Sequence, residues 1–155
     1  MTKRSAGILA FRKNDNEYEF LLIHPGGPYW KNKEENTWSI PKGIVESGEE
    51  ELETAIREFQ EETGFQITAD EFIDLSEVKL ASGKIIKIWA INEDFDAALM
   101  KSNLFRMEWP PRSGKFQEFP EADKAQWFDL ETAKLKIVKG QIPVLEELHN
   151  HLYIN

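Results

Sequence analysis

The sequence predicts an α/β fold in which a central mixed β-sheet is covered by helices on both faces. Segments rich in β-branched and aromatic residues occur both before and after a strongly amphipathic helical segment, and two more helical segments close the chain. Strands and helices in this order bury the sheet when helices pack on both of its faces. With 155 residues, the chain has room for one core, so residues 1–155 are expected to form a single domain.

Three strands are expected before the central helix. Residues 6–11 and 18–24 have the composition of strands, and the turn-forming residues 14–16 join them. The Pro and Gly residues at 25–28 end the second strand, because proline lacks a donor for the strand ladder. A short strand-like segment follows at 37–41.

The second half of the chain returns to strands and ends in helices. Residues 71–80 and 84–92 are expected to pair as a hairpin that turns at 81–83. Residues 94–120 contain two adjacent prolines and a Ser-Gly pair, which predict a long functional loop flanked by strand ends. A strand at 125–128 and helices at 130–136 and 143–152 complete the expected elements.

The composition excludes several classes of protein. No apolar run approaches the roughly 20 residues of a membrane span, and the N-terminus does not resemble a secretory signal. The absence of cysteine excludes disulfides, thiolate metal sites and a cysteine nucleophile, and it favours a cytoplasmic protein. The formal net charge of -9 disfavours nucleic acid as a partner, and it means that a polyanionic substrate needs bridging cations.

The central helix carries two stripes of side chains. It is expected to begin with a capping box formed by Ser47 and Glu50, and to end at Gly64, a residue that tolerates the left-handed conformation. The apolar stripe for the core consists of Leu52, Ala55, Ile56 and Phe59.

The second stripe is acidic and consists of Glu58, Glu61 and Glu62. The last two lie near the helix C-terminus, where the helix dipole opposes negative charge, and no lysine on the helix relieves their repulsion. A divalent cation such as Mg²⁺ or Mn²⁺ would remove this conflict, since hard cations prefer carboxylate oxygens. The alternative is a solvated acidic face, which is common on helices.

The spacing around this stripe is specific. Gly43, Glu49 and residues 57–65 match without a gap the pattern G-x5-E-x7-R-E-U-x-E-E-x-G-U, where U is a bulky apolar residue. This segment resembles the Nudix box of the Nudix (MutT-like) pyrophosphohydrolases, and every fixed position of that pattern is present. Residues 5–7, 38–43 and 121–128 are also similar to this family. The resemblance implies a Nudix-type α/β/α sandwich with a central mixed β-sheet.

The same resemblance implies a reaction. Nudix enzymes hydrolyse a nucleoside diphosphate linked to another moiety by attack of water on phosphorus, with Mg²⁺ as cofactor and Mn²⁺ as a possible substitute. Glu58, Glu61 and Glu62 are then expected to share metal binding and base catalysis. Arg57 is expected to orient a carboxylate by a forked ion pair, and the alternative is a surface salt bridge.

Further metal ligands are expected outside the acidic stripe. By resemblance, the Gly43 carbonyl is one candidate, and Glu49 either binds metal or supports Arg57. Family members often add an acid from a loop after the box, and Glu118 and Glu121 are the candidates here, with Glu118 placed first. Each of these two could equally be a solvated loop residue.

Basic and aromatic residues are candidates for substrate binding. Arg4 and Lys42 are the cations best placed by sequence to contact phosphate, and Arg112 and Lys115 come next. Each could also be an ordinary solvated cation. Tyr29 and Trp30 follow the Pro-Gly turn and are candidates for stacking on a base, with coverage of the core edge as the alternative.

The function expected from these residues is Mg²⁺-dependent hydrolysis of a nucleoside or dinucleoside polyphosphate. The Pro41-Lys42-Gly43 sequence resembles dinucleoside-polyphosphate and diphosphoinositol-polyphosphate hydrolases. The alternatives are a hydrolase of nucleoside triphosphates, oxidised ones included, and a binding module that senses a nucleotide without cleaving it. The expected partner is a small molecule, with neither nucleic acid nor membrane involved, and the sequence leaves the oligomeric state open.

Overall fold

The computed structural model describes residues 3–154, and Met1, Thr2 and Asn155 lie outside the described part. The strands are β1 (Arg4–Asn14), β2 (Glu17–Pro25), β3 (Lys42–Ile44), β4 (Ile73–Asp74), β5 (Val78–Lys79), β6 (Ile85–Asn92), β7 (Leu104–Glu108), β8 (Phe116–Pro120) and β9 (Ala122–Asp129). The helices are α1 (Glu51–Thr63), α2 (Leu130–Lys136) and α3 (Ile142–Ile154), and two short 3₁₀ turns lie at Ala97–Leu99 and Lys139–Gln141.

The central sheet is mixed, as the sequence predicts. Its strand order is β4-β6-β1-β2-β9, with β3 paired to β1 and β5 paired to β6. β1 runs parallel to β6, and the other pairs are antiparallel. The expected hairpin at 71–92 is present, but its first arm is split into the two short strands β4 and β5.

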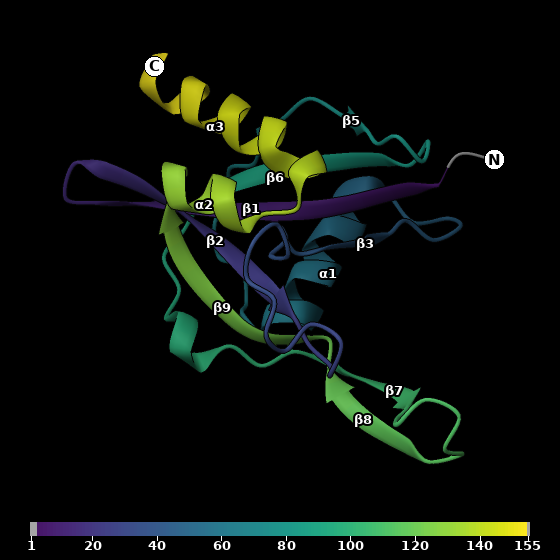
Figure 1. Cartoon of the computed structure of the whole chain (residues 1–155). Coiled ribbons are helices and arrows are strands. Elements are labelled where there is room, and N and C mark those ends of the chain that lie inside the picture. Colours follow the sequence, from purple (N-terminus) through teal and green to yellow (C-terminus); the bar gives the residue numbers. More distant parts are fainter. Residues whose placement is uncertain (1–2, 155) are drawn as a thin grey trace.

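Helices cover both faces of this sheet (Figure 1). On one face, β1 and β2 side chains pack with those of α2 and α3 in a core that includes Leu9, Phe20 and Leu145. On the other face, alternate residues of β1 such as Ile8 pack against Phe59 of α1. Because successive side chains of a strand point to opposite faces, β1 supplies both cores and is buried through most of its length. The predicted α/β/α sandwich is therefore confirmed.

The two ends of α1 differ in how well the sequence predicts them. The capping box at Ser47 is wrong, because the helix begins at Glu51 and its N-cap residue, Glu50, makes no side-chain capping hydrogen bond. Gly48 has φ 81°, a left-handed conformation that separates Ser47 from the helix. The predicted end at Gly64 is confirmed, with φ 77° and an amide that donates to the Gln60 carbonyl at 2.8 Å.

The long loop expected at 94–120 is wrong in part. β7 and β8 form a two-stranded sheet of their own, with Phe105 opposite Phe119 and Arg106 opposite Glu118. Aromatic and opposite-charge pairs of this kind stabilise neighbouring strands by about 0.2–1 kcal/mol each. Figure 1 shows the resulting hairpin projecting from the body of the molecule. Within residues 3–154, no helix combines the length and the hydropathy that a bilayer crossing requires.

Candidate active site at the end of α1

The acidic stripe of α1 lies against β3. A Cβ atom at residue 43 would overlap the carboxyl group of Glu58, so only glycine leaves room for that carboxyl group beside the strand. This close approach fixes the side of α1 that faces β3. The fold thus brings the first residue of the Nudix box, Gly43, into contact with one of its glutamates, 15 positions along the chain.

Glu62 has the most unusual environment in the stripe. Its Oε2 atom is buried and has no hydrogen-bond partner within the described residues. Burial, and after it the negative charge of Glu58, raises the pKa of this carboxyl group from 4.5 to about 8, against the opposing effects of a hydrogen bond from the Lys42 backbone and of the Lys42 charge. A buried carboxylate without a partner is costly, so this oxygen is available to a cation or a proton.

Arg57 holds the neighbouring carboxylates together. Its Nε and Nη2 atoms donate to the two oxygens of Glu49 at 2.8 and 3.0 Å, which is the forked geometry expected of this arginine. Its Nη1 atom donates to Glu58 at 3.2 Å and to Glu61 at 3.0 Å. The Arg57 guanidinium holds the pKa of Glu49 at about 2, so Glu49 is ionised at neutral pH.

These carboxylates fit a divalent cation by their chemistry. Burial raises the pKa of Glu58, although the positive charge of Arg57 lowers it. The ionised form of Glu58 would therefore be stabilised by a further positive charge nearby. As they stand, no three acidic or histidine side chains among residues 3–154 converge in a ready metal-binding group. Mg²⁺ is commonly held by one or two carboxylates together with water and phosphate oxygens, so these glutamates could bind it without forming a complete protein cage.

The structure brings Glu121, and not Glu118, to this cluster. Glu121 precedes β9, and the pKa of its carboxyl group is raised by loss of surrounding water and by the negative charge of Glu61. Its charge also raises the pKa of Glu58 and Glu62. Glu118 lies on the exposed hairpin opposite Arg106, so the order in which the sequence ranks these two acids is reversed by the geometry.

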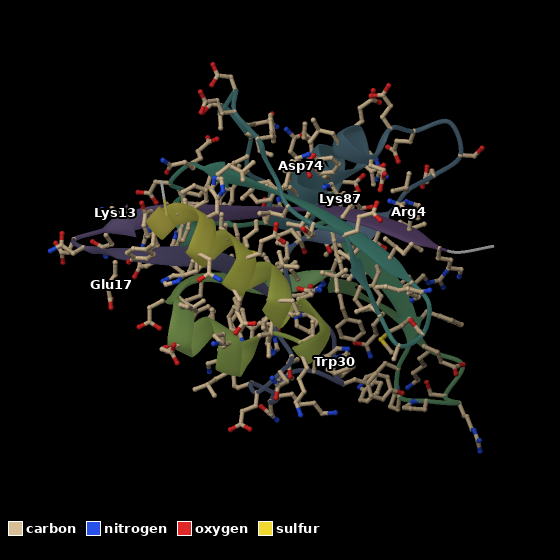
Figure 2. All side chains as sticks on the ribbon, turned by 90° about the horizontal axis from the view of Figure 1, so that it is seen from above. Arg4, Lys13, Glu17, Trp30, Asp74 and Lys87 are labelled. Carbon is tan, nitrogen blue, oxygen red and sulfur yellow. The ribbon has the colours of Figure 1, made fainter. Side chains whose placement is uncertain are left out.

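The two cations ranked first for phosphate binding have different surroundings. Arg4 lies at one end of β1, and the Lys13–Glu17 turn lies at the other end (Figure 2). The Arg4 guanidinium forms ion pairs with Glu51 at 3.0 Å and with Glu77. Its charge is therefore engaged near the start of α1, away from the acidic stripe at the end of that helix. The Lys42 backbone hydrogen-bonds the Glu62 carboxyl group, and both this bond and the Lys42 charge lower the pKa of Glu62. Lys42 also lines a cavity of about 230 Å³ together with Leu80 and Gln141.

The loop between β2 and β3 carries the two aromatic residues expected to contact substrate. Tyr29 is 55% exposed and Trp30 is 43% exposed, so neither covers the core as the alternative requires. The Lys33 ammonium lies 5.1 Å from the Trp30 ring centroid. The Tyr29 ring meets the Trp109 ring edge-on, with centroids 5.2 Å apart.

Trp109 was not among the candidates that the sequence suggests. It follows β7, and only the two prolines after it mark that stretch of sequence as irregular. Arg112 and Lys115, the second pair of expected cations, lie in the same turn of the hairpin and form no ion pair within the described chain.

A comparison with known protein families gives a match over most of the chain. Residues 1–148 match the family described as NUDIX domain. The chain belongs to the NUDIX family. It is accordingly a Nudix hydrolase, an enzyme that acts on phosphoanhydride bonds.

Several members of the Nudix family resemble the chain at low identity. An asymmetrical bis(5'-nucleosyl)-tetraphosphatase of Sus scrofa is 28% identical, over 98% of this chain and 97% of that protein. The corresponding enzyme of Rattus norvegicus is 40% identical over 72 residues, which span 43% of this chain and 45% of the rat protein. A solved structure of a C. elegans Ap4A hydrolase binary complex is 25% identical, with a TM-score of 0.68 over 97% of this chain and 99% of that one.

Proposed function

We propose that residues 1–155 act as one Nudix domain that hydrolyses dinucleoside polyphosphates by attack of water on phosphorus, with Mg²⁺ as cofactor. The Nudix relatives named as tetraphosphatases support this class of substrate. The Pro41-Lys42-Gly43 segment resembles both dinucleoside-polyphosphate and diphosphoinositol-polyphosphate hydrolases, and it ends at the glycine that contacts Glu58 of the acidic stripe.

The observation that carries the proposal is the buried and unpaired Oε2 of Glu62. It lies in a group of carboxylates in which burial, and after it the charges of neighbouring carboxylates, raises the pKa of Glu58 and Glu62, in a protein whose formal net charge is already -9. A cation-binding role accounts for this unpaired buried oxygen, and in the metal-free protein a proton neutralises the same group. Mn²⁺ can replace Mg²⁺, since both prefer carboxylate oxygens.

Each residue then has a definite task. Glu58, Glu61 and Glu62 supply metal-binding oxygens and, among them, the base that takes the proton from water, with Gly43 and Glu121 as further oxygen ligands. Bound Mg²⁺ would supply charge neutralisation of the phosphates and a lower pKa of the attacking water. Arg57 positions Glu58 and Glu61 through its hydrogen bonds to both. Lys42 provides a positive charge for phosphate at the border of the cavity that it lines.

The cavity beside Lys42 offers a place for one nucleoside. Its wall combines aliphatic side chains with the amide of Gln141, and its volume of about 230 Å³ suits a single base rather than a whole dinucleotide. Gln141 is itself buried, and its side chain contacts the Ile40 amide at 2.9 Å and the Ser39 hydroxyl.

A substrate panel tests the proposal directly. Initial rates would be measured on diadenosine tetraphosphate, ATP, ADP-ribose and an inositol pyrophosphate, with Mg²⁺ and with excess chelator. We expect the highest kcat/KM on diadenosine tetraphosphate and no turnover in chelator. Full activity in chelator would refute the metal requirement, and a preference for ATP or the inositol pyrophosphate would refute the substrate class.

A further inference from the structure

The β7–β8 hairpin begins and ends beside the candidate active site. Within the described residues it pairs with no strand of the central sheet. Its root is hydrogen-bonded to the end of α1, because the Asn103 amide donates to the Glu61 carbonyl at 2.8 Å and the Glu121 amide donates to the Asn103 carbonyl at 2.8 Å. The root of the hairpin therefore adjoins the end of α1 that carries the acidic stripe.

The loop between β2 and β3 forms a second wall beside the hairpin (Figure 1). The Gly26 amide donates to the Glu121 carbonyl at 3.0 Å, and a Cβ at residue 26 would overlap the Pro120 carbonyl. A Cβ at Gly27 would lie 3.1 Å from the Phe105 ring. The two glycines thus allow the loop to pack tightly against the base of the hairpin, which fixes where the loop presents its aromatic residues.

Tyr29 and Trp109, the aromatic pair, connect the two walls. Tyr29 follows Gly26 by three residues, so its Cα lies within about 11 Å of Gly26 even if the chain is fully extended. Gly26 is in turn hydrogen-bonded to Glu121, the acid that borders the cluster. The aromatic pair is therefore one short segment away from the acidic stripe.

The aromatic and basic side chains of the β7–β8 hairpin and of the loop beside it suit a nucleotide. Exposed aromatic faces stack on bases, a contact worth about 1–3 kcal/mol per base. Two basic side chains, Arg112 and Lys115, lie at the turn of the hairpin and form no ion pair among residues 3–154, although the whole chain has a formal net charge of -9. Glu108, which could neutralise them, instead accepts from the backbone amides of Arg112 and Gly114 at 2.9 and 3.2 Å. Arg106 lies opposite Glu118, with its guanidinium 4.6 Å from the Phe116 ring centroid.

We propose that the aromatic pair and the basic hairpin bind the second nucleoside of a dinucleoside polyphosphate, the one that does not occupy the cavity beside Lys42. This inference rests on the proposed function and adds a subsite to it. Tyr29 stacks on the distal base, Trp109 supports the Tyr29 ring, and Arg112 and Lys115 contact the phosphate nearest that nucleoside.

The test compares two substrates that differ only in the second nucleoside. Diadenosine tetraphosphate and adenosine 5'-tetraphosphate have the same phosphate chain, and only the first can reach the aromatic pair with a base. We expect Tyr29→Ala and Trp109→Ala to raise KM for diadenosine tetraphosphate by at least about fivefold, given the range for base stacking. KM for adenosine 5'-tetraphosphate should change less than twofold, about the resolution of such measurements.

Tyr153→Ala is the matched control, because Tyr153 is 56% exposed, close to the value for Tyr29, and lies on α3 beside Tyr18 and His149. It should leave KM for both substrates unchanged. Because Trp109 is half-buried, Tyr29→Ala on the exposed loop decides the outcome if Trp109→Ala perturbs the fold.

The outcomes separate this subsite from the proposed function. If the wild-type protein hydrolyses both tetraphosphates but Tyr29→Ala leaves KM unchanged, or raises it equally for both, the subsite is refuted and the function stands. If the wild-type protein hydrolyses neither, the proposed function fails and the subsite fails with it.

Discussion

At the scale of single residues, the candidate site depends on close contacts around the carboxyl groups of α1. Gly43 has no Cβ, and this is what admits the Glu58 carboxyl group beside β3. Glu62 contributes an oxygen that is buried and unpaired. Both features concern the same three carboxylates, so small changes at either position should affect catalysis more than folding.

Gly43→Ala should displace Glu58. The added methyl group overlaps the carboxyl group of Glu58, a flexible side chain that can rotate away, so we expect a loss of kcat of at least about tenfold with the fold retained. Steady-state kinetics on diadenosine tetraphosphate would measure the loss. Gly83→Ala is the control: a Cβ there meets nothing within 4 Å, and its φ of 92° adds backbone strain far from Glu58, so an equal loss of kcat in both variants would contradict the explanation.

Glu62→Gln should separate catalysis from stability. The substitution keeps the shape and removes the charge, so kcat should fall by at least about 10². The free energy of unfolding of the metal-free protein should rise at pH 8, because a buried carboxylate near the negative end of the helix dipole is replaced by a neutral amide. Urea denaturation in chelator measures this, and a variant that is less stable than wild type would indicate a structural role for Glu62.

At the scale of elements, the end of α1 fixes the position of the hairpin root. Gly64 ends the helix in the left-handed conformation, and the following chain returns so that the Lys101 amide donates to the Thr63 carbonyl at 2.8 Å. A Cβ at residue 64 would lie 2.6 Å from the Lys101 carbonyl oxygen. The helix end and the segment that leads into β7 are therefore held together at a glycine.

Gly64→Ala should destabilise this junction. The left-handed conformation costs a residue with a Cβ about 1–2 kcal/mol, and the contact with Lys101 adds to that cost. Gly48→Ala provides the comparison, since Gly48 also has positive φ but no atom lies within 4 Å of its added Cβ. We expect urea midpoints in the order wild type, Gly48→Ala, Gly64→Ala, and equal midpoints for the two variants would show that the Lys101 contact has no energetic effect.

At the scale of the whole molecule, the carboxyl groups of the site make stability depend on pH. The pKa of Glu62 rises from 4.5 to about 8 on folding, and those of Glu58 and Glu121 rise as well. A raised pKa means that the folded state holds its proton more tightly than the unfolded state does. The resulting stabilisation is complete below about pH 4.5 and is lost as pH rises through 8.

The metal-free protein should therefore lose stability between about pH 5 and 9. Glu49 works in the opposite direction, but its pKa of about 2 places its effect in acid, where its stabilisation is lost as pH falls. Urea midpoints in chelator across this range would measure the slope. Glu62→Gln should flatten it, and so should saturating Mg²⁺; a slope unchanged in the variant would show that Glu62 does not titrate in this range.

Much of this architecture follows from local patterns in the sequence. Strand-like composition between turn residues predicts β1, β2 and β9, and the apolar stripe that includes Ala55 and Phe59 predicts the face of α1 that is buried. The end of α1 is predicted because Gly64 is a strong local signal. The start is mispredicted because Ser47 satisfies a capping pattern, whereas the backbone at Gly48 takes the chain out of the helix.

The sequence by itself determined the family, the acidic stripe and the glycines around it, because these depend on spacing along one helix and its flanking loops. Only the tertiary structure decided what depends on contacts between distant segments. The closure of β7 onto β8 places Glu118 on an exposed strand and leaves Glu121 beside Glu61, although the two acids are three positions apart. The same closure brings Trp109 to Tyr29, 80 positions earlier in the chain, which no local pattern encodes.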